Sequence, residues 1–331
     1  MSNTSNPQVT IIVVPRERFS YTRESLTSIY KNTNYPFELI YIDAGSPRHI
    51  KDYLATEAEN KQFKLIRTDF YLSPNHARNL GLQQATTQYV VFIDNDVIVS
   101  PGWLQSLIQC ANETEATIVS PLICQGTSLH TEIHCAGGET GILEETKNGI
   151  ARRRIIEKIY MQGRKLVQTQ IERQPTKLAE FHCVLVRRNI FTSIGYLDEN
   201  LLNTKEHVDL CMLVQKANGL IYLEPKSIVT YVPTTSLELT DIPFYMLRWS
   251  DAWEKASLHH LCKKWNLTED EYFKNRYKRL GWRRHMTIIN PITSKIPSRI
   301  GAKISNKLLR LIDKPINKLL TNYYTKKYQH T

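Results

Sequence analysis

Residues 89–97, Tyr89-Val-Val-Phe-Ile-Asp-Asn-Asp-Val97, decide the fold class of this chain. The apolar run from Val90 to Ile93 ends abruptly in Asp94-Asn95-Asp96. Its length and β-branched content are typical of a strand buried on both faces of a parallel sheet, and such strands point their C-terminal ends at the ligand crevice. Two carboxylates one residue apart repel unless a positive charge lies between them, and a divalent cation carrying diphosphate oxygens meets that need. An exposed turn that closes a strand is the alternative interpretation.

The first hundred residues alternate between expected strands and helices. Strands are expected at 9–14, 38–43, 63–67 and 89–94, and helices at about 22–31, 47–57 and 75–85. On the first helix, Leu26, Ile29 and Tyr30 form an apolar face at helical spacing. This alternation predicts an α/β fold with a single doubly wound, mostly parallel sheet, right-handed crossovers and flanking helices.

Three further motifs precede the acidic one in a fixed order. The first strand stops at Pro15, the second ends in Asp43-Ala-Gly-Ser46, and Asn75-His-Ala-Arg-Asn-Leu-Gly81 opens a helix. Together with Asp94-Asn95-Asp96, this set resembles the family 2 glycosyltransferases of the GT-A fold.

The resemblance continues downstream and covers roughly residues 9–232. It includes Ser100-Pro-Gly-Trp-Leu104, the stretch from Phe181 to Glu199, and Glu206-His-Val-Asp-Leu210. Two positions depart from the family pattern: His207 stands where an aspartate is usual, and Tyr231 stands where a histidine is often found.

The resemblance implies a metal site and a donor site. Asp96 is expected to bind Mn²⁺ or Mg²⁺ directly, with Asp94 as a further metal ligand or a contact nearer the ribose. Asp43 is expected to hydrogen-bond the nucleobase, and the backbone around Pro15-Arg16-Glu17 to flank it. Arg78 is expected to contact the nucleotide or its phosphates.

The catalytic base is expected in the acidic helix start. Glu206 and Asp209 lie three residues apart, on one face if a helix begins there. Because the usual aspartate is His207, Glu206 is the first candidate and Asp209 the second, while His207 is itself a candidate because of its near-neutral pKa. Alternatively, Glu206 caps the helix and His207 faces solvent.

Between residues 100 and 180 the pattern is weaker. Gly137, Gly138 and Gly141 indicate loops, and the polar stretch that begins at Arg152-Arg-Arg154 suggests a mobile flap. The segment His130-Thr-Glu-Ile-His134 lacks the H-E-x-x-H order of zinc proteases, so no zinc site is expected there. Neither a P-loop nor a G-x-G-x-x-G motif occurs.

Composition indicates a globular protein in a reducing compartment. The 331 residues are 41% hydrophobic, no run of eighteen apolar residues occurs, and the six cysteines form no C-x-x-C pair. Residues 1–8 are polar and expected to be disordered. The expected localisation is cytoplasmic, or peripheral at the inner face of the cell membrane.

Positive charge is concentrated at the C-terminus. Residues 272–331 contain fifteen Lys and Arg and the single acid Asp313, although the whole chain carries only +11. The composition changes near residues 266–271. The expected organisation is therefore a GT-A domain over 9–265, with a nucleotide-binding half (9–100) and an acceptor half (101–265), followed by a basic helical region over 266–331.

That C-terminal region shows helical amphipathicity. Apolar residues recur at helical spacing and are interleaved with basic residues, and Pro315 is expected to start a second amphipathic segment. The apolar residues are Ile300, Ile304, Leu308, Leu311, Ile312, Ile316, Leu319 and Leu320. This pattern favours an anionic membrane surface as partner for residues 290–331. The alternatives are nucleic-acid binding, given Tyr323, Tyr324 and Tyr328 near lysines, and an ordinary packed helix.

The sequence thus predicts a metal-dependent, inverting sugar transferase. Its partners would be a UDP- or GDP-sugar and a hydroxyl of a glycan or lipid-linked acceptor, with no nucleic acid expected. A nucleotide-sugar-binding protein without catalysis, suggested by His207, and a basic nucleic-acid-binding protein are the alternatives.

Overall fold

The computed structural model describes residues 7–147, 149–233 and 237–329, so residues 1–6 of the expected disordered N-terminus lie outside the described residues. The first hundred residues contain the predicted strands and helices, with ends shifted by a few residues. They are β1 (Val9–Val14), α1 (Thr22–Asn32), β2 (Glu38–Ala44), α2 (Arg48–Lys61), β3 (Lys64–Thr68), α3 (Pro74–Leu82), β4 (Tyr89–Asp94) and β5 (Val97–Val99). The predicted α/β alternation is confirmed.

The middle of the chain extends this sheet and adds a hairpin. Its elements are α4 (Trp103–Thr114), β6 (Ile118–Gln125), β7 (Glu132–Cys135), β8 (Gly138–Lys147), β9 (Ile150–Ile159), η1 (Leu166–Gln168), β10 (Gln174–Pro175), β11 (Cys183–Arg187), α5 (Ile190–Ile194), α6 (Glu206–Lys216) and β12 (Ile221–Tyr231). The main sheet has the order β10-β12-β6-β11-β4-β1-β2-β3. Strands β4, β1, β2 and β3 run parallel, as do β6 and β12, whereas β11 lies antiparallel between β4 and β6.

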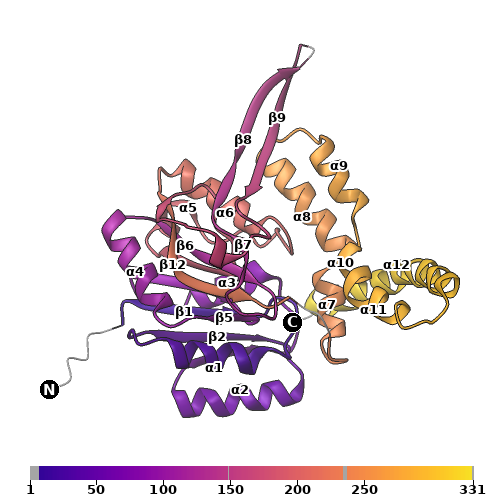
Figure 1. The fold of residues 1–331 in the computed structure, drawn as a ribbon, viewed down its shortest axis with the longest axis horizontal. Helices are drawn as coiled ribbons and strands as arrows, with labels where there is room; N and C mark the ends of the chain where they lie inside the picture. Colours follow the sequence, from indigo (N-terminus) through magenta and orange to yellow (C-terminus); the bar gives the residue numbers. More distant parts are fainter. Residues whose placement is uncertain (1–6, 148, 234–236, 330–331) are drawn as a thin grey trace.

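Both faces of the parallel half are covered because side chains alternate along each strand. In β1, Val9, Ile11 and Val13 join a core cluster with side chains of α1, α2 and α4. Ile12 and Val14 point the other way, into a second cluster with side chains of α3, α6 and α8 (Asp251–Lys264). Figure 1 shows α1 and α2 on one side of this sheet. The continuous apolar runs are therefore explained by burial on both faces.

Helix α3 lies unusually close to β1 at one glycine. A Cβ atom on Gly81 would lie 2.4 Å from Cγ2 of Ile12, a separation that real Cβ atoms essentially never show. Because of this close packing, Arg78, which lies about one helical turn before Gly81, is held at the C-terminal edge of the sheet.

Of the glycines expected in loops, Gly137 lies between β7 and β8, whereas Gly138 and Gly141 lie in β8, so the expectation was wrong for these two. The polar stretch from Arg152 belongs to β9 of a long hairpin, and its mobility stays a prediction. Strands β8 and β9 pair in ten registered positions, from Gly138 opposite Ile159 to Lys147 opposite Ile150. Figure 1 shows the hairpin projecting away from the sheet. The polar residues of the hairpin are explained by its exposed position. A polar composition indicates exposure, but it does not distinguish a loop from a two-stranded hairpin.

The C-terminal region is helical, as predicted. It contains α9 (Glu271–Lys278), α10 (Trp282–Arg284), η2 (His285–Ile289), α11 (Asn290–Thr293) and α12 (Arg299–Gln329), and it is preceded by α7 (Ile242–Arg248) and α8. Phe273 of α9 is fully buried in the cluster that also holds Ile12 of β1 and Val208 of α6. Residues after 266 therefore share a core with the sheet.

Helix α12 is a single 31-residue helix that contains Pro315. The expected restart at this proline is therefore wrong, because the helix continues through it. Among the described residues, no helix combines the length and the apolar character that crossing a bilayer requires.

Candidate active site

Asp94, the last residue of β4, is a buried carboxylate paired with two arginines. Arg16 Nη1 lies 3.0 Å from Asp94 Oδ2, and Arg78 Nη2 lies 3.3 Å from Asp94 Oδ1. Burial alone would raise the pKa of Asp94, but Arg16, Arg78 and a contact from His182 hold it below its usual value. Asp94 is therefore ionised, and it orients both guanidinium groups at the edge of the sheet.

Asp96 is equally buried and has no such partner. Its exposed fraction is 0%, and neither carboxylate oxygen has a hydrogen-bond partner among the described residues. Burial, together with the nearby charges of Asp94 and Glu17, raises the pKa of Asp96 well above its usual value. A buried carboxylate in this state costs stability unless a cation compensates it.

A divalent cation fits this arrangement. One ligand atom each from Asp94, Asp96 and His182 lie within 4.8 Å of one another. Carboxylate oxygens are the ligands that Mg²⁺ prefers, and imidazole is compatible with Mn²⁺.

Glu17 and Tyr231 form the wall next to this pair. The Tyr231 hydroxyl donates to Glu17 Oε2 at 3.0 Å, and the Glu17 carboxylate lies 3.5 Å from both Arg16 and Arg283. Burial opposes the ionisation of Glu17, yet Arg283 and Arg16 keep its pKa below the usual value. The ring of Tyr231, the last residue of β12, also lies tilted against the ring of His182, with the two centroids 4.1 Å apart.

Asp43, at the end of β2, has local partners. Its Oδ1 accepts a 3.0 Å hydrogen bond from the Ser46 amide, and its Oδ2 accepts one from Arg67. Pro15 follows β1 and is buried. Neither residue is among those that line the main cavity described next.

The cavity has a volume of about 360 Å³ and is rich in arginine. It lies beside Arg16, Arg78 and His182 and extends toward the start of α6. Its lining is Arg16, Arg78, His134, Glu157, Ile159, Gln162, Glu180, Phe181, His182, Asn203, Thr204, Lys205, Glu206, His207, Tyr231, Arg248, Trp249, Glu254, Arg276, Arg279, Trp282 and Arg283. This concentration of guanidinium groups suits a polyanionic ligand such as a diphosphate.

Glu206 is the carboxylate that the start of α6 presents to this cavity. The helix begins at Glu206, after Lys205 adopts a left-handed conformation with φ of 71°. Arg248 Nη2 lies 3.4 Å from Glu206 Oε1, and the same guanidinium donates to the Arg16 carbonyl at 3.2 Å. Burial lowers the pKa of Arg248 to about 10. Arg248 thus links Glu206, the candidate base, to the backbone of Arg16.

The other two candidates for the base have different surroundings. His207 lines the cavity and its Nε2 lies 3.4 Å from Glu157, a β9 carboxylate that also binds Lys205. Asp209 accepts hydrogen bonds of 2.8 Å from Lys264 and Trp265 and is not among the lining residues. The structure therefore brings Glu206 and His207, but not Asp209, to the cavity.

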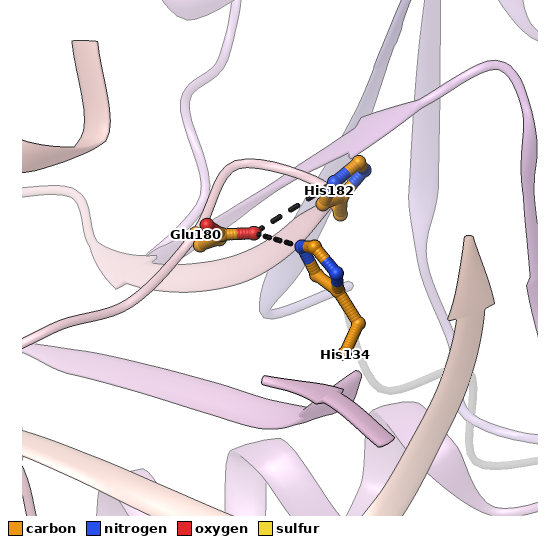
Figure 2. Close-up of side chains that lie close together, drawn as sticks. All are labelled: His134, Glu180 and His182. Atoms are coloured by element: carbon orange, nitrogen blue, oxygen red, sulfur yellow. Dashed lines mark hydrogen bonds and ion pairs between the residues drawn. The ribbon is translucent and has the colours of Figure 1, made fainter. Parts of the chain in front are cut away.

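Three residues of this site, Glu180, His182 and Arg248, were not predicted from the sequence, and His134 lies in a segment where no zinc site was expected. His134, Glu180 and His182 converge on one another, as Figure 2 shows, and Arg248 comes from α7. Because Cys183 of β11 pairs with Ile93 of β4, His182 falls opposite Asp94. If the sequence had predicted that β11 pairs antiparallel with β4, His182 would have been expected beside Asp94. No sequence motif indicates that Arg248 belongs to the site.

Carboxylates and arginines lie at the C-terminal ends of parallel strands, where open α/β sheets bind their ligands, and the fold is of the GT-A type. The chain matches Glycosyl transferase family 2 over residues 10–195 and belongs to that family. The predicted resemblance is thereby confirmed.

Individual relatives are distant. The chain is 24% identical over 238 residues to the pre-mycofactocin glycosyltransferase of Mycobacterium tuberculosis, covering 71% of this chain and 45% of that protein. It is 29% identical over 128 residues to the chondroitin synthase of Escherichia coli, covering 36% and 18%. The chain thus spans less than half the length of these relatives.

Among solved structures, the chain is similar to GalNAc-T7 with UDP, GalNAc and Mn²⁺. The TM-score is 0.53 at 17% identity, with 89% of this chain and 59% of that chain covered. This likeness shows a shared fold.

Proposed function

We propose that the protein transfers a sugar from a nucleoside-diphosphate sugar to a hydroxyl group, with inversion at the anomeric carbon. The observation that carries the proposal is Asp96, a buried carboxylate with no hydrogen-bond partner among the described residues, two positions after Asp94, whose partners Arg16 and Arg78 line the cavity. Family membership and the UDP and Mn²⁺ in the name of a structural neighbour support a UDP-sugar and a divalent cation. A GDP-sugar remains the second donor choice.

Asp96, with Asp94, would hold Mn²⁺ or Mg²⁺, which when bound neutralises charge on the diphosphate leaving group. Arg78 and Arg16 would contact the phosphates from the opposite side. Asp43, Pro15 and Glu17 would surround the nucleoside. The donor would thus be fixed with its anomeric carbon toward Glu206.

Glu206 would act as the general base, accepting the proton of the acceptor hydroxyl. Its contact with Arg248 keeps the side chain at the cavity. His207 is the second candidate, and Asp209 is the weaker one because Lys264 and Trp265 already bind it. The acceptor would be a glycan or a lipid-linked sugar.

A thermal-shift screen of nucleotide sugars with and without Mn²⁺ tests donor and metal together, because a ligand that binds only the folded state raises its Tm. Release of free nucleoside diphosphate then separates a transferase from a nucleotide-sugar-binding protein without catalysis. Asp96→Asn is the control that should lose the Mn²⁺-dependent part of the shift. Failure of every donor to raise Tm would contradict the proposal.

A second proposal concerns α12, which lies at the edge of the molecule (Figure 1) and has exposed apolar side chains. Between 48% and 73% of each side chain is exposed for Ile300, Ile304, Leu308, Leu311, Ile312, Ile316, Leu319 and Tyr323. The face toward the body is polar: Asp313, Asn317 and Thr321 are buried. Asn317 Nδ2 donates to the Met246 carbonyl at 2.8 Å. The helix is therefore fixed with its apolar stripe away from the core.

We infer that this stripe binds an anionic bilayer surface, which would place the enzyme peripherally at the cytoplasmic face of a membrane. Exposed basic side chains lie among the apolar ones: Lys303, Lys307, Arg310, Lys314 and Lys318. A second copy of the helix would bring like charges together, whereas anionic lipid brings opposite charges and an apolar layer.

Sedimentation with vesicles tests this second proposal. The chain should sediment with anionic vesicles and not with neutral ones, and less so as salt rises. The triple variant Leu308→Ser, Leu311→Ser, Leu319→Ser should remain in the supernatant, while Leu239→Ser, at an 84% exposed site outside α12, should not change binding. Self-association or nucleic-acid binding that the same triple variant abolishes, without vesicle binding, would overturn the proposal.

A further inference from the structure

His134, Glu180 and His182 form a compact cluster at the wall of the cavity (Figure 2). His134 lies in β7, and the other two precede β11. Glu180 Oε2 is 2.8 Å from His134 Nε2 and 3.7 Å from His182 Nε2, and the two imidazole rings are 5.1 Å apart and nearly perpendicular. No more than 15% of any of the three side chains is exposed. His182 also lies near Asp94 and Asp96, whereas the chemistry of His134 and Glu180 is not used by the proposed sugar transfer.

The hydrogen-bond partners of His134 fix its tautomer. The side-chain amide of Gln125 donates to Glu132, so its carbonyl oxygen Oε1 faces His134 Nδ1 at 3.0 Å. Nδ1 must therefore carry a proton. A neutral His134 then directs the lone pair of Nε2 at the Glu180 carboxylate, and two acceptors face each other across 2.8 Å. A second proton on the ring, a proton on Glu180 or a bound cation relieves this contact.

His182 meets the same difficulty from two sides. Its Nδ1 is 3.4 Å from Asp94 Oδ2, and its Nε2 is 3.7 Å from Glu180 Oε2. A neutral imidazole has one N–H, so it can serve only one of the two carboxylates. A cation between Glu180 Oε2 and the two Nε2 atoms would satisfy both rings, leaving each Nδ1–H for Gln125 Oε1 and Asp94.

We propose that His134, Glu180 and His182 bind a transition-metal cation of the Zn²⁺ class, at a site separate from the Asp96 carboxylate. Two imidazoles and one carboxylate are a common ligand set for Zn²⁺, in which the fourth position is left to water or substrate. Mg²⁺ prefers oxygen ligands, so the two sites differ in the cations they select. The fourth position faces the cavity, where a bound hydroxyl or phosphate oxygen would complete the coordination. This site does not depend on the proposed transfer reaction.

Metal stoichiometry on the full-length protein tests the proposal. After treatment with a chelator and dialysis against Zn²⁺ in the presence of excess Mg²⁺, elemental analysis should find one Zn²⁺ per chain. Zn²⁺ should also raise Tm when Mg²⁺ is already saturating. His134→Gln and Glu180→Gln should each lose the bound Zn²⁺ and this rise in Tm.

Two controls separate this site from other ligands. Asp96→Asn should keep the Zn²⁺, and so should His49→Gln, because His49 is a half-exposed histidine outside the cavity lining. Circular dichroism would verify that each variant is folded, and the two cluster variants provide independent tests if one fails to fold. Intact protein without Zn²⁺, or Zn²⁺ that both cluster variants retain, for example on cysteine thiolates, would overturn the proposal.

Discussion

The end of β4 and the interior face of α12 each bury an aspartate, and the two aspartates are in opposite situations. Asp313 of α12 accepts hydrogen bonds of 3.1 Å and 2.7 Å from Arg284 and lies 3.2 Å from His285. Asp96 has no hydrogen-bond partner among the described residues, although it is completely buried. Both carboxylates are removed from water, but among the described residues only Asp313 has cationic side chains within hydrogen-bond distance that compensate its charge.

This difference separates a structural carboxylate from a functional one. Removing either partner of a compensated buried charge destabilises the fold, because the other charge is left buried and unpaired. An uncompensated one destabilises the fold and is explained by a ligand that supplies the missing charge. The same residue type should therefore give opposite results in the two regions when it is replaced.

The largest effect is expected for Asp96→Asn. Because the amide removes the charge that would hold the cation, transfer should fall by roughly 10³-fold or more. The free energy of unfolding without metal should rise, since the uncompensated charge is gone. Urea unfolding and product release measure the two quantities. A variant that is less stable without metal would contradict the comparison.

The next largest effect is expected for Asp313→Ala, which should lower the free energy of unfolding by about 3 kcal/mol because Arg284 is left buried and unpaired. Sugar transfer per folded molecule should be unchanged below the new Tm. Asp251 also contacts Arg284 but is 28% exposed, so Asp251→Ala is a matched control with a smaller loss. Equal losses in both variants would mean that burial does not distinguish them.

Glu206→Gln should have an intermediate effect, since Arg248 is the one hydrogen-bond partner of the Glu206 side chain within the described part of the chain. The amide keeps the shape and removes the proton acceptor, so kcat should fall by about 10² while donor affinity is kept. Asp209→Asn, on the same helix, is the control with little change in kcat. If Asp209→Asn loses turnover and Glu206→Gln does not, the base lies three residues further along.

The smallest effect is a pH dependence of stability without metal. Because burial raises the pKa of Asp96 in the folded state, the folded protein binds more protons than the unfolded chain above the unfolded pKa of about 4. Stability should thus decline as pH rises from there toward the raised pKa, by at most about 1.4 kcal/mol per pH unit. Asp96→Asn should have a shallower slope than the wild type, and added Mn²⁺ should flatten the wild-type curve. Identical slopes in the two proteins would refute the assignment.

The sequence predicted what local patterns determine. The run before Asp94 and the alternation of strands and helices identified the parallel half because burial on both faces leaves a continuous apolar stretch. The amphipathicity of α12 was also visible, but the pattern does not say which face meets the protein. Asp313, Asn317 and Thr321 settle that question only through partners far away in the sequence, such as Arg284 and Met246.

The candidate site was predictable only where it lies in short motifs. Asp94, Asp96 and Arg78 lie in short motifs at a strand end and a helix start, and the family resemblance of those motifs named them as candidates. His134, His182 and Arg248 come from three separate segments, and the antiparallel insertion of β11 brings His182 to Asp94. Nothing local encodes that insertion. The preference for Glu206 over Asp209 likewise depends on Lys264 and Trp265, about 55 residues downstream of Asp209.

The close approach of Gly81 to Ile12 determines how far α3 lies from the sheet, and therefore where Arg78 lies in the cavity wall. Since no Cβ fits between α3 and β1, the width of one missing methyl group determines how near the helix lies to the sheet. Arg78 rides on that helix and reaches Asp94 across 3.3 Å. A side chain at position 81 would push the helix outward and withdraw the guanidinium from its carboxylate. The pairing of Arg78 with Asp94 at the end of β4 thus depends on the absence of a Cβ atom at position 81.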